Sequence, residues 1–305
     1  MQNQDGHVLE SEKETITSVQ TSETDDWASF RDDDIMQQQS AILADEAGKI
    51  PFIGDKEPLS SLSAEYSSGN SILLEKIKVL TEQYAAIRRA RGDGNCFFRS
   101  FMFAYLEHIL ESQDRAEVDR VTANVEECRK TLLSLGYAEF TFEDFFALFL
   151  EQLESVLSGT EASKSHEELV QRSRDQSVSD YVVMFFRFIT SGEIRKRSEF
   201  YEPFIQGLTN ASVEQVGFLK LFLFCKSSVE PMGEESDHVH ITALSDALGV
   251  AIRVVYLDRS CHDNGTVSVN HHDFVPTNNT VDAHPCKPFV SLLYRPGHYD
   301  ILYPK

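Results

Sequence analysis

Residues 92–99 read Gly-Asp-Gly-Asn-Cys-Phe-Phe-Arg, and this stretch decides how the rest of the sequence is interpreted. The glycines on either side of Asp93 predict a sharp turn, because glycine adopts backbone conformations that other residues avoid. The run from Cys96 to Leu110 repeats its apolar residues at helical spacing and predicts a buried helix. The pattern therefore places Cys96 at the N-terminus of a helix, directly after a tight turn.

A cysteine in this position has the surroundings that a nucleophile needs. Cysteine attacks an acyl group as its thiolate, and an ordinary thiol with a pKa near ~8.5 is mostly protonated at neutral pH. The unpaired N–H groups and partial positive charge of a helix N-terminus favour the thiolate. The same N–H groups can bind the oxyanion that forms when a carbonyl is attacked. Taken alone, the motif fits an Asp-Gly turn before a buried structural cysteine equally well.

Residues 295–303, Arg-Pro-Gly-His-Tyr-Asp-Ile-Leu-Tyr, supply the base that cysteine catalysis requires. If His298 opens a strand, His298 and Asp300 point to the same face, because side chains along a strand repeat every two residues. The carboxylate is then expected to accept the imidazole Nδ1–H and leave Nε2 facing the thiol. An exposed His and Asp at a hairpin edge would explain this segment alone. Together with Cys96, it favours a catalytic pair.

The remaining sequence predicts an α+β domain, with a helical first half around a sheet built mainly from the C-terminal part. Helices are expected at 71–83, 96–110, 115–135, 142–157, 178–190 and 240–248, and strands at 84–91, 251–257, 289–294 and 298–303. Thr141 and Asp144 resemble a capping box before the 142–157 helix. Pro296-Gly297 predicts a tight hairpin turn between the last two strands.

The charge of the chain is acidic and unevenly distributed. The net charge is −21 over 305 residues, and residues 1–50 contain twelve Asp and Glu against three Lys and Arg. Residues 1–47 lack apolar periodicity and predict a disordered acidic tail, so the folded domain is expected at 48–305. An acidic surface repels phosphate backbones, which argues against a nucleic-acid partner and favours a basic protein.

Cysteine usage and hydropathy bear on the compartment. Five cysteines without a Cys-x-x-Cys pair favour a reducing environment. The first residues show no basic region followed by an apolar run, so no secretory signal is expected. The apolar stretches 181–189 and 216–225 are shorter than the ~18 residues of a membrane span. We expect a cytoplasmic monomer without membrane association, and nuclear entry stays open.

Histidine and cysteine pairs raise the question of a metal site. His238-Val239-His240, His271-His272 and Cys261-His262 follow one another in the C-terminal third. They lack the short paired ligand spacings of structural zinc sites, and we therefore expect no metal.

The two catalytic segments are also recognisable as motifs. Residues 92–99 resemble the nucleophile motif of the ovarian-tumour (OTU) class of cysteine proteases, and Tyr294–Tyr303 resembles the histidine motif of its otubain branch. Further stretches similar to otubains lie at 140–145, 175–181, 229–232 and 235–241. The resemblance runs from about residue 50 to the end and is that of a plant otubain.

This resemblance implies a papain-like α+β fold with an OTU core at about 85–304, and hydrolysis of the isopeptide bond between the ubiquitin C-terminus and a lysine. Carried over by position, Cys96 is the nucleophile, His298 the general base and Asp300 its orienting group. Asp93 shapes the oxyanion loop through its backbone N–H. Thiol, imidazole and oxyanion hole complete the acyl-transfer machinery, so no cofactor is expected.

The resemblance also suggests binding partners. It places Asp237, His238 and His240 near a ubiquitin-binding face, although a partly buried polar turn before a helix explains each residue equally well. Ubiquitin and polyubiquitin chains are the expected partners, and ubiquitin-conjugating enzymes are further candidates. Three functions remain open: a ubiquitin isopeptidase, a non-catalytic protein that sequesters ubiquitin-loaded conjugating enzymes, and a papain-like hydrolase of an unrelated amide.

One segment departs from the family pattern. In otubains, the stretch that matches 212–215 runs almost directly into the one that matches 224–226, so Val216–Leu223 reads as an apolar insertion of about two helical turns. It is expected either to extend the preceding helix and bury its side chains or to bulge outward as an apolar patch. We predict that it is absorbed locally, that Cys96, His298 and Asp300 still converge, and that solubility or stability falls.

Overall fold

The C-terminal strands alternate between two apolar faces, as their sequence predicts. In the last strand, β6 (His298–Pro304), Ile301 joins a core cluster with helix α4 (Cys96–Ser112), and its neighbour Leu302 joins a second cluster with α3 (Ser71–Gln83). In β5 (Val290–Arg295), Leu292 packs in the cluster with α4 and Leu293 packs in the cluster with α3. Side chains two residues apart thus share a face, so both faces of the sheet are buried.

The computed structural model describes residues 48–66, 70–157, 165–208, 217–260, 267–277 and 287–305, all within the unit Glu46–Lys305. The tail predicted at 1–47 lies outside these residues. The sheet has the order β1-β2-β6-β5-β3-β4. Its other strands are β1 (Ile53–Pro58), β2 (Tyr84–Ala90), β3 (Ile252–Tyr256) and β4 (His271–Phe274). Only β3 and β5 pair in parallel among these strands; the other neighbours are antiparallel.

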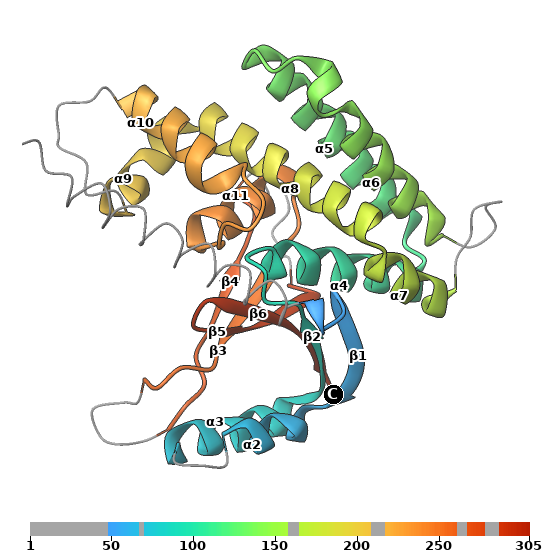
Figure 1. Ribbon diagram of the computed structural model, residues 1–305, viewed down its shortest axis with the longest axis vertical. Coiled ribbons are helices and arrows are strands. Elements are labelled where there is room, and N and C mark those ends of the chain that lie inside the picture. Colours follow the sequence, from blue (N-terminus) through green and yellow to red (C-terminus); the bar gives the residue numbers. More distant parts are fainter. Residues whose placement is uncertain (1–47, 67–69, 158–164, 209–216, 261–266, 278–286) are drawn as a thin grey trace, which may run out of the picture. The chain divides into compact units, whose positions relative to one another are not determined.

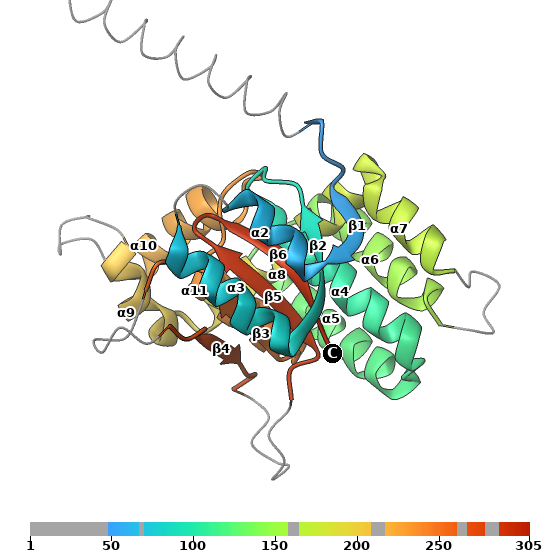
Figure 2. The ribbon, with the colours of Figure 1, turned by 90° about the horizontal axis from the view of Figure 1, so that it is seen from below.

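Helices cover both faces of the sheet. Helix α4 packs on one face, and α2 (Leu62–Glu65) and α3 lie across the other (Figures 1 and 2). The remaining helices are α5 (Arg115–Ser134), α6 (Glu143–Ser155), α7 (His166–Arg174), α8 (Gln176–Lys196), α9 (Ser198–Leu208), α10 (Gly217–Phe224) and α11 (His238–Leu248). All six expected helices and all four expected strands are present, while β1, β4, α2, α7, α9 and α10 are additional.

Aromatic packing fixes the nucleophile helix in place. Phe98 and Phe101 of α4 contact the ring of Phe186 on α8, and Phe149 of α6 stacks on Phe185 with ring centroids 4.2 Å apart. Removing one such buried ring by substitution to Ala typically costs about 3 to 5 kcal/mol. Because the apolar residues of α4 point into this core, its first residue is held in a fixed position at the end of a rigid element.

The predicted capping box at Thr141 and Asp144 is wrong. Thr141 lies in a short 3-10 turn (Glu139–Thr141), and its hydroxyl donates to the Ala138 carbonyl oxygen at 2.6 Å instead of capping α6. Helix α6 begins at Glu143 without a side-chain cap. A capping box does occur at α7, where Ser165 and Glu168 exchange side-chain and backbone hydrogen bonds. The sequence Ser-His-Glu-Glu at 165–168 carried that signal.

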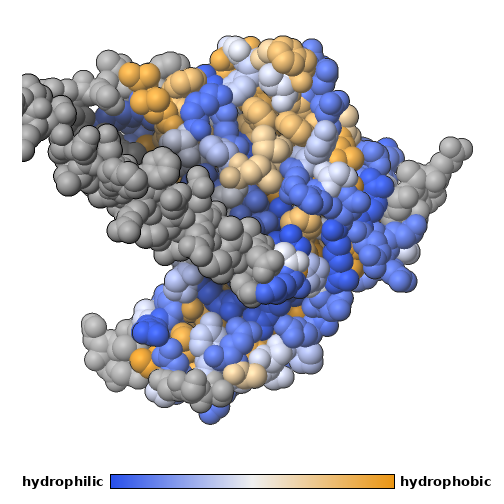
Figure 3. Space-filling view, in the orientation of Figure 1, coloured by the Kyte–Doolittle hydropathy of each residue, from blue (hydrophilic) through white to orange (hydrophobic). Residues whose placement is uncertain are grey.

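The apolar segment 216–223 combines features of both expected arrangements. Val216 lies outside the described residues, and the other seven residues begin α10, which runs on into a π-helical turn at Cys225–Val229 rather than extending α9. Leu221 is buried in a cluster with residues of α8 and α9. Leu219 and Leu223, one turn apart, are 46% and 47% exposed. Apolar residues accordingly gather on the surface at α10 (Figure 3).

Candidate active site

Cys96 is the first residue of α4 and is only 4% exposed. The turn before Cys96 requires glycine at position 94 for two reasons. The φ of Gly94 is 75°, in the left-handed region, and a Cβ there would lie 1.7 Å from the carbonyl oxygen of Gly233. No other residue type fits so close a backbone approach. The glycine turn predicted from the sequence therefore lies directly against a second segment, residues 229–234.

Asp93 braces this turn mainly through its side chain. One carboxylate oxygen accepts the N–H of Asn95 at 3.1 Å, and the other pairs with Arg99, whose guanidinium also binds Asp180 at 2.8 Å. The backbone N–H of Asp93 donates to the Arg91 carbonyl oxygen at 3.1 Å and must leave this acceptor before it can bind an oxyanion. Its role in the oxyanion hole thus stays a prediction. The N–H groups of the first turn of α4 have no acceptor within the helix.

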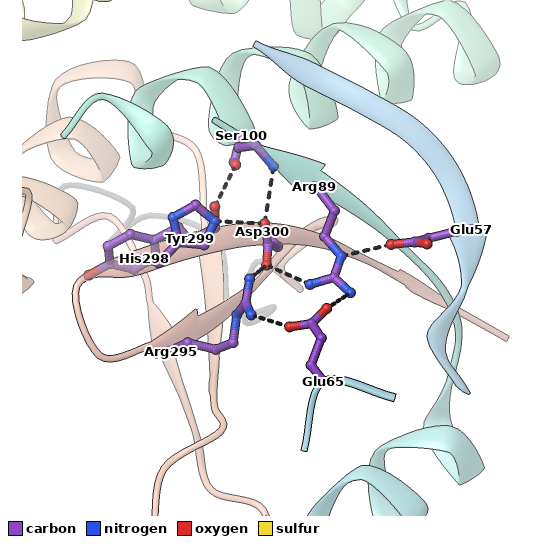
Figure 4. A network of polar contacts seen from close by, with 9 residues as sticks. Glu57, Glu65, Arg89, Ser100, Arg295, His298, Tyr299 and Asp300 are labelled. Atoms are coloured by element: carbon purple, nitrogen blue, oxygen red, sulfur yellow. Dashed lines mark hydrogen bonds and ion pairs between the residues drawn. The ribbon is translucent and has the colours of Figure 1, made fainter. Parts of the chain in front are cut away.

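His298 and Asp300 share one face of β6, as predicted. The hairpin that carries them turns at Pro296-Gly297, with Arg295 paired to His298 across the two strands and Gly297 at φ 75°. Nε2 of His298 lies 2.9 Å from Oδ1 of Asp300 (Figure 4).

The expected assignment of the two ring nitrogens is wrong. It is Nε2 that contacts the carboxylate, which leaves Nδ1 for the thiol of Cys96. The spacing along a strand explains this. Residues two apart are separated by about 6.6 Å, and Nε2 at the far end of the imidazole bridges that distance better than Nδ1, which lies next to Cβ.

The surroundings of His298 favour its protonated form. Burial of the imidazole favours the neutral ring, but the hydrogen bond to Asp300 and the contact with Cys96 outweigh burial and raise the pKa of His298 from 6.5 to about 9. At neutral pH the ring is therefore an imidazolium that faces the sulfur. A positive group beside a cysteine favours the thiolate, so the pair is suited to nucleophilic attack on a carbonyl.

Asp300 is fully buried and remains ionised because it is surrounded by donors. Besides His298, it accepts the backbone N–H of Ala90 at 3.0 Å and a hydrogen bond from Arg295 at 2.6 Å. Burial favours the neutral carboxylic acid, yet the bond from His298 and the charge of Arg295 outweigh it and hold the pKa of Asp300 below its usual 3.8. The carboxylate can therefore orient the imidazole and stabilise its positive charge.

A second layer of ion pairs supports Asp300 (Figure 4). Arg295 also binds Glu65 of α2 at 2.9 Å, Glu65 pairs with Arg89 of β2, and Arg89 binds Glu57 of β1 at 2.7 Å. Sequence reasoning missed these residues. Glu57, Glu65 and Arg89 come from separate elements 200 or more residues before the histidine motif. The pairing of β1 with β2 and of β2 with β6 brings Glu57 and Arg89 to it.

The predicted ubiquitin-binding residues Asp237 and His240 form the N-terminal cap of α11. The Asp237 carboxylate accepts the N–H of Val239 at 2.8 Å, and the backbone N–H of Asp237 donates to Nδ1 of His240 at 3.1 Å. His240 is 2% exposed, and its Nε2 contacts the Ser228 carbonyl oxygen at 3.1 Å. The ring is buried because it caps the helix, and the role of His240 at a ubiquitin-binding face stays a prediction. For Asp237 the role stays a prediction.

His238 is accessible. Its Nε2 lies 2.7 Å from the hydroxyl of Tyr256, and its ring stacks on Phe274. It lines an apolar cavity of about 260 Å³ together with Phe200 and Phe204 of α9. Its role in binding also stays a prediction.

The histidine pairs do not converge on a metal site within the described residues. No group of three or more His, Cys, Asp or Glu side chains there could hold a metal ion. Cys261 and His262 lie outside the described residues. Within the described ranges, no helix combines the length and apolar character of a membrane span.

Comparison with known proteins identifies the family. The sequence model of Peptidase C65 Otubain matches residues 45–304. The chain belongs to this otubain family. A relative from Arabidopsis thaliana, named "OVARIAN TUMOR DOMAIN-containing deubiquitinating enzyme 1", is 66% identical over all of this otubain and 96% of that protein. The human "Ubiquitin thioesterase OTUB1" is 40% identical over 89% of this otubain and 90% of its own length.

Solved structures agree with the sequence relatives. The one titled "The structure of h/ceOTUB1-ubiquitin aldehyde-UBC13~Ub" superposes with a TM-score of 0.74 at 34% identity, covering 90% of this otubain and 98% of that chain. A complex with UBCH5B~Ub in place of UBC13~Ub gives a TM-score of 0.73. The predicted resemblance to otubains and the papain-like α+β fold of the OTU type are confirmed.

Proposed function

We propose that this otubain is a cysteine-type deubiquitinase that hydrolyses isopeptide bonds at the C-terminus of ubiquitin, in conjugates and in polyubiquitin chains. The observation that carries the proposal is the hydrogen-bonded pair of His298 and Asp300, whose imidazole faces Cys96 at the N-terminus of α4. The names of the relatives, deubiquitinating enzyme and ubiquitin thioesterase, support the same activity and substrate.

The chemistry follows from the positions of these groups. The Cys96 thiolate attacks the isopeptide carbonyl, a C–S bond forms, and the carbonyl π electrons move to oxygen, where N–H groups at the start of α4 stabilise the charge. When the tetrahedral intermediate collapses, the C–N bond breaks, and the His298 imidazolium gives its proton to the departing lysine amine. The neutral imidazole then removes a proton from water, which attacks the thioester and releases ubiquitin and the thiolate.

A ubiquitin that carries an electrophilic group at its C-terminus tests this proposal. We expect it to form a covalent adduct with the wild-type protein, and Cys96→Ala to form no adduct and to cleave no ubiquitin chain. Cys128→Ala is the matched control, because burial raises the pKa of that thiol to about 12 and leaves it unreactive. Normal cleavage by Cys96→Ala would refute the assignment. Cleavage of a different amide without labelling by the ubiquitin probe would favour an unrelated substrate.

A second candidate function is the sequestration of ubiquitin-loaded conjugating enzymes. It is favoured by one observation, the similarity to solved complexes whose titles name UBC13~Ub and UBCH5B~Ub. Cys96→Ala separates the two functions, since a sequestering protein still inhibits ubiquitin transfer by the conjugating enzyme after this substitution. A loss of inhibition together with cleavage would leave only the enzymatic function.

For the cellular compartment, we propose the cytoplasm, with the nucleus as the alternative. The five cysteines without a paired motif support a reducing compartment. A fluorescent fusion of the full chain distinguishes the two locations. Exclusion from both would contradict the proposal.

A further inference from the structure

A buried arginine on α8 joins the nucleophile loop to the loop that faces it. Arg187 has no exposed surface. One terminal nitrogen donates to the Val229 carbonyl oxygen at 2.9 Å. The other donates to Asn95 Oδ1 at 2.7 Å and to the carbonyl oxygens of Glu234 at 2.8 Å and Gly94 at 3.2 Å. A single guanidinium thus contacts residues on both sides of the close approach between the two loops.

The same junction has a second hydrogen bond. Asn95, the residue before Cys96, accepts the N–H of Gly233 at 3.0 Å through the same side-chain oxygen that binds Arg187. The position of the Cys96 peptide therefore depends on the 229–234 segment through Asn95. Loss of the guanidinium would leave three carbonyl oxygens and one amide oxygen without this donor in a buried site.

Arg187 has no direct counter-ion; its guanidinium lies over the ring of Phe98, 5.0 Å from the ring centroid. All four of its hydrogen-bond acceptors are neutral, and no carboxylate among the described residues lies within ion-pair distance of it. Its Nε has no hydrogen-bond partner in that part of the chain. By contrast, the equally buried Arg99 on the same side of the site pairs with both Asp93 and Asp180. A buried cation without a counter-ion is costly, and such groups cluster at functional sites.

Arg187 nevertheless remains a cation at neutral pH. Burial, the largest influence, lowers its pKa to about 10; the carboxylates of Glu234 and Asp93 act in the opposite direction, and Arg99 acts with burial. The charge of the Cys96 sulfur also acts on Arg187, which places the two groups within electrostatic reach. A thiolate at Cys96 would supply the negative charge that this arginine lacks.

Several elements face Cys96 and set its electrostatic surroundings. His298 and Tyr299 of β6 and Arg187 of α8 interact electrostatically with Cys96, and Asp93 of the loop before α4 acts on Arg187. Of the two cations, the imidazolium is already paired with Asp300. The guanidinium is the cation without a direct counter-ion.

We propose that Arg187 is a positioning residue for the reaction: it locks the Gly94–Asn95 turn to the 229–234 segment, and its uncompensated charge favours the Cys96 thiolate. The inference rests on the proposed function of Cys96 as nucleophile. It predicts two separable consequences of substitution, one from the lost hydrogen bonds and one from the lost charge.

The experiment compares Arg187→Met, which removes charge and hydrogen bonds, with Arg187→Lys, which keeps the charge but lacks the planar fork. Alkylation of Cys96 by iodoacetamide is followed by mass spectrometry as a function of pH, alongside kcat and KM for ubiquitin-chain cleavage and the melting temperature. Arg195→Met is the matched control. Arg195 is a half-buried arginine two turns along α8, bonded to the Leu135 carbonyl oxygen at 3.3 Å.

We expect Arg187→Met to raise the pH midpoint of Cys96 alkylation by about one unit, the size typical of a lost neighbouring charge. Arg187→Lys should restore most of that midpoint while kcat stays at least about tenfold below wild type, a loss of about 1.4 kcal/mol in transition-state stabilisation. Arg195→Met should lower the melting temperature without moving the midpoint. If Arg187→Met does not fold, Arg187→Gln, which is uncharged but can still donate hydrogen bonds, replaces it.

An unchanged midpoint in a folded, uncharged Arg187 variant overturns the proposal, as does an equal shift in Arg195→Met. A wild-type kcat in Arg187→Lys overturns the geometric part of the proposal, the locking of the Gly94–Asn95 turn. The proposed function fails on a different result, normal chain cleavage by Cys96→Ala. The two failures are therefore distinguishable.

Discussion

Asp300→Asn should move the alkaline limb of the pH–rate profile to lower pH. The substitution keeps an oxygen that can accept from His298 Nε2 at the present 2.9 Å but removes the negative charge. The rise of the His298 pKa from 6.5 to about 9 corresponds, at 1.36 kcal/mol per pH unit, to about 3 kcal/mol in favour of the imidazolium. The bond to Asp300 is the largest of the contributions that raise this pKa, ahead of the contact with Cys96.

The sign follows from the role of the imidazolium. Cleavage requires the protonated ring to donate to the leaving amine, so activity falls as pH rises through the pKa of His298. We expect the limb in kcat/KM near pH 9 for the wild type and about one to two pH units lower for Asp300→Asn. At pH 6 the two proteins should differ least, because both rings are then largely protonated.

The assay is the hydrolysis of a fluorogenic ubiquitin amide between pH 5 and 10. Melting temperatures are measured in parallel, because Asp300→Asn removes one of the two carboxylates paired with Arg295 and should destabilise the fold by a few kcal/mol. A folded variant whose alkaline limb stays near pH 9 would refute the reasoning. It would mean that Cys96 or another group, and not Asp300, holds the proton on His298.

The same two groups give the wild-type protein a pH-dependent stability. The raised pKa of His298 contributes stabilisation that is complete below pH 6.5 and is lost as pH rises through about 9. The lowered pKa of Asp300 contributes stabilisation that is present above pH 3.8 and is lost as pH falls through its folded-state value. Thermal unfolding scans across this range should therefore show a decline at both ends. A flat profile above pH 8 would contradict the assignment for His298.

The remaining predictions concern activity and two segments of the chain. His298→Ala should reduce chain cleavage nearly as much as Cys96→Ala. Asp300→Ala should reduce it less, because the carboxylate mainly orients the base. Equal losses of kcat in the His298 and Asp300 variants would give Asp300 a larger role. Deleting residues 1–47 should change the melting temperature little, since the segment offers little apolar surface to bury; a drop of many degrees would show that it packs on the domain. Deleting residues 216–223 should leave chain cleavage intact and raise solubility, because it removes exposed leucines. Unfolding of the deletion variant would show that this segment is an integral part of the domain.

The sequence by itself determined the nucleophile turn, the histidine hairpin and the alternation of the C-terminal strands. These features are local: Gly94 must adopt a positive φ, His298 and Asp300 share a face because a strand repeats every two residues, and the run after Cys96 has a helical period. Each is encoded within a few consecutive residues. Such patterns therefore predict the structure without knowledge of distant contacts.

Tertiary structure alone decided how these parts work together. The order of the strands places β2 beside β6 and so brings Arg89 and the backbone of Ala90 to Asp300. The capping of α11 buries His240, which the motif had suggested for binding. Arg187 is one polar residue within an apolar helix of the sequence, and only the packing of α8 against two loops brings it to the turn before Cys96. Contacts between residues far apart in the chain depend on the whole fold, and no local pattern encodes them.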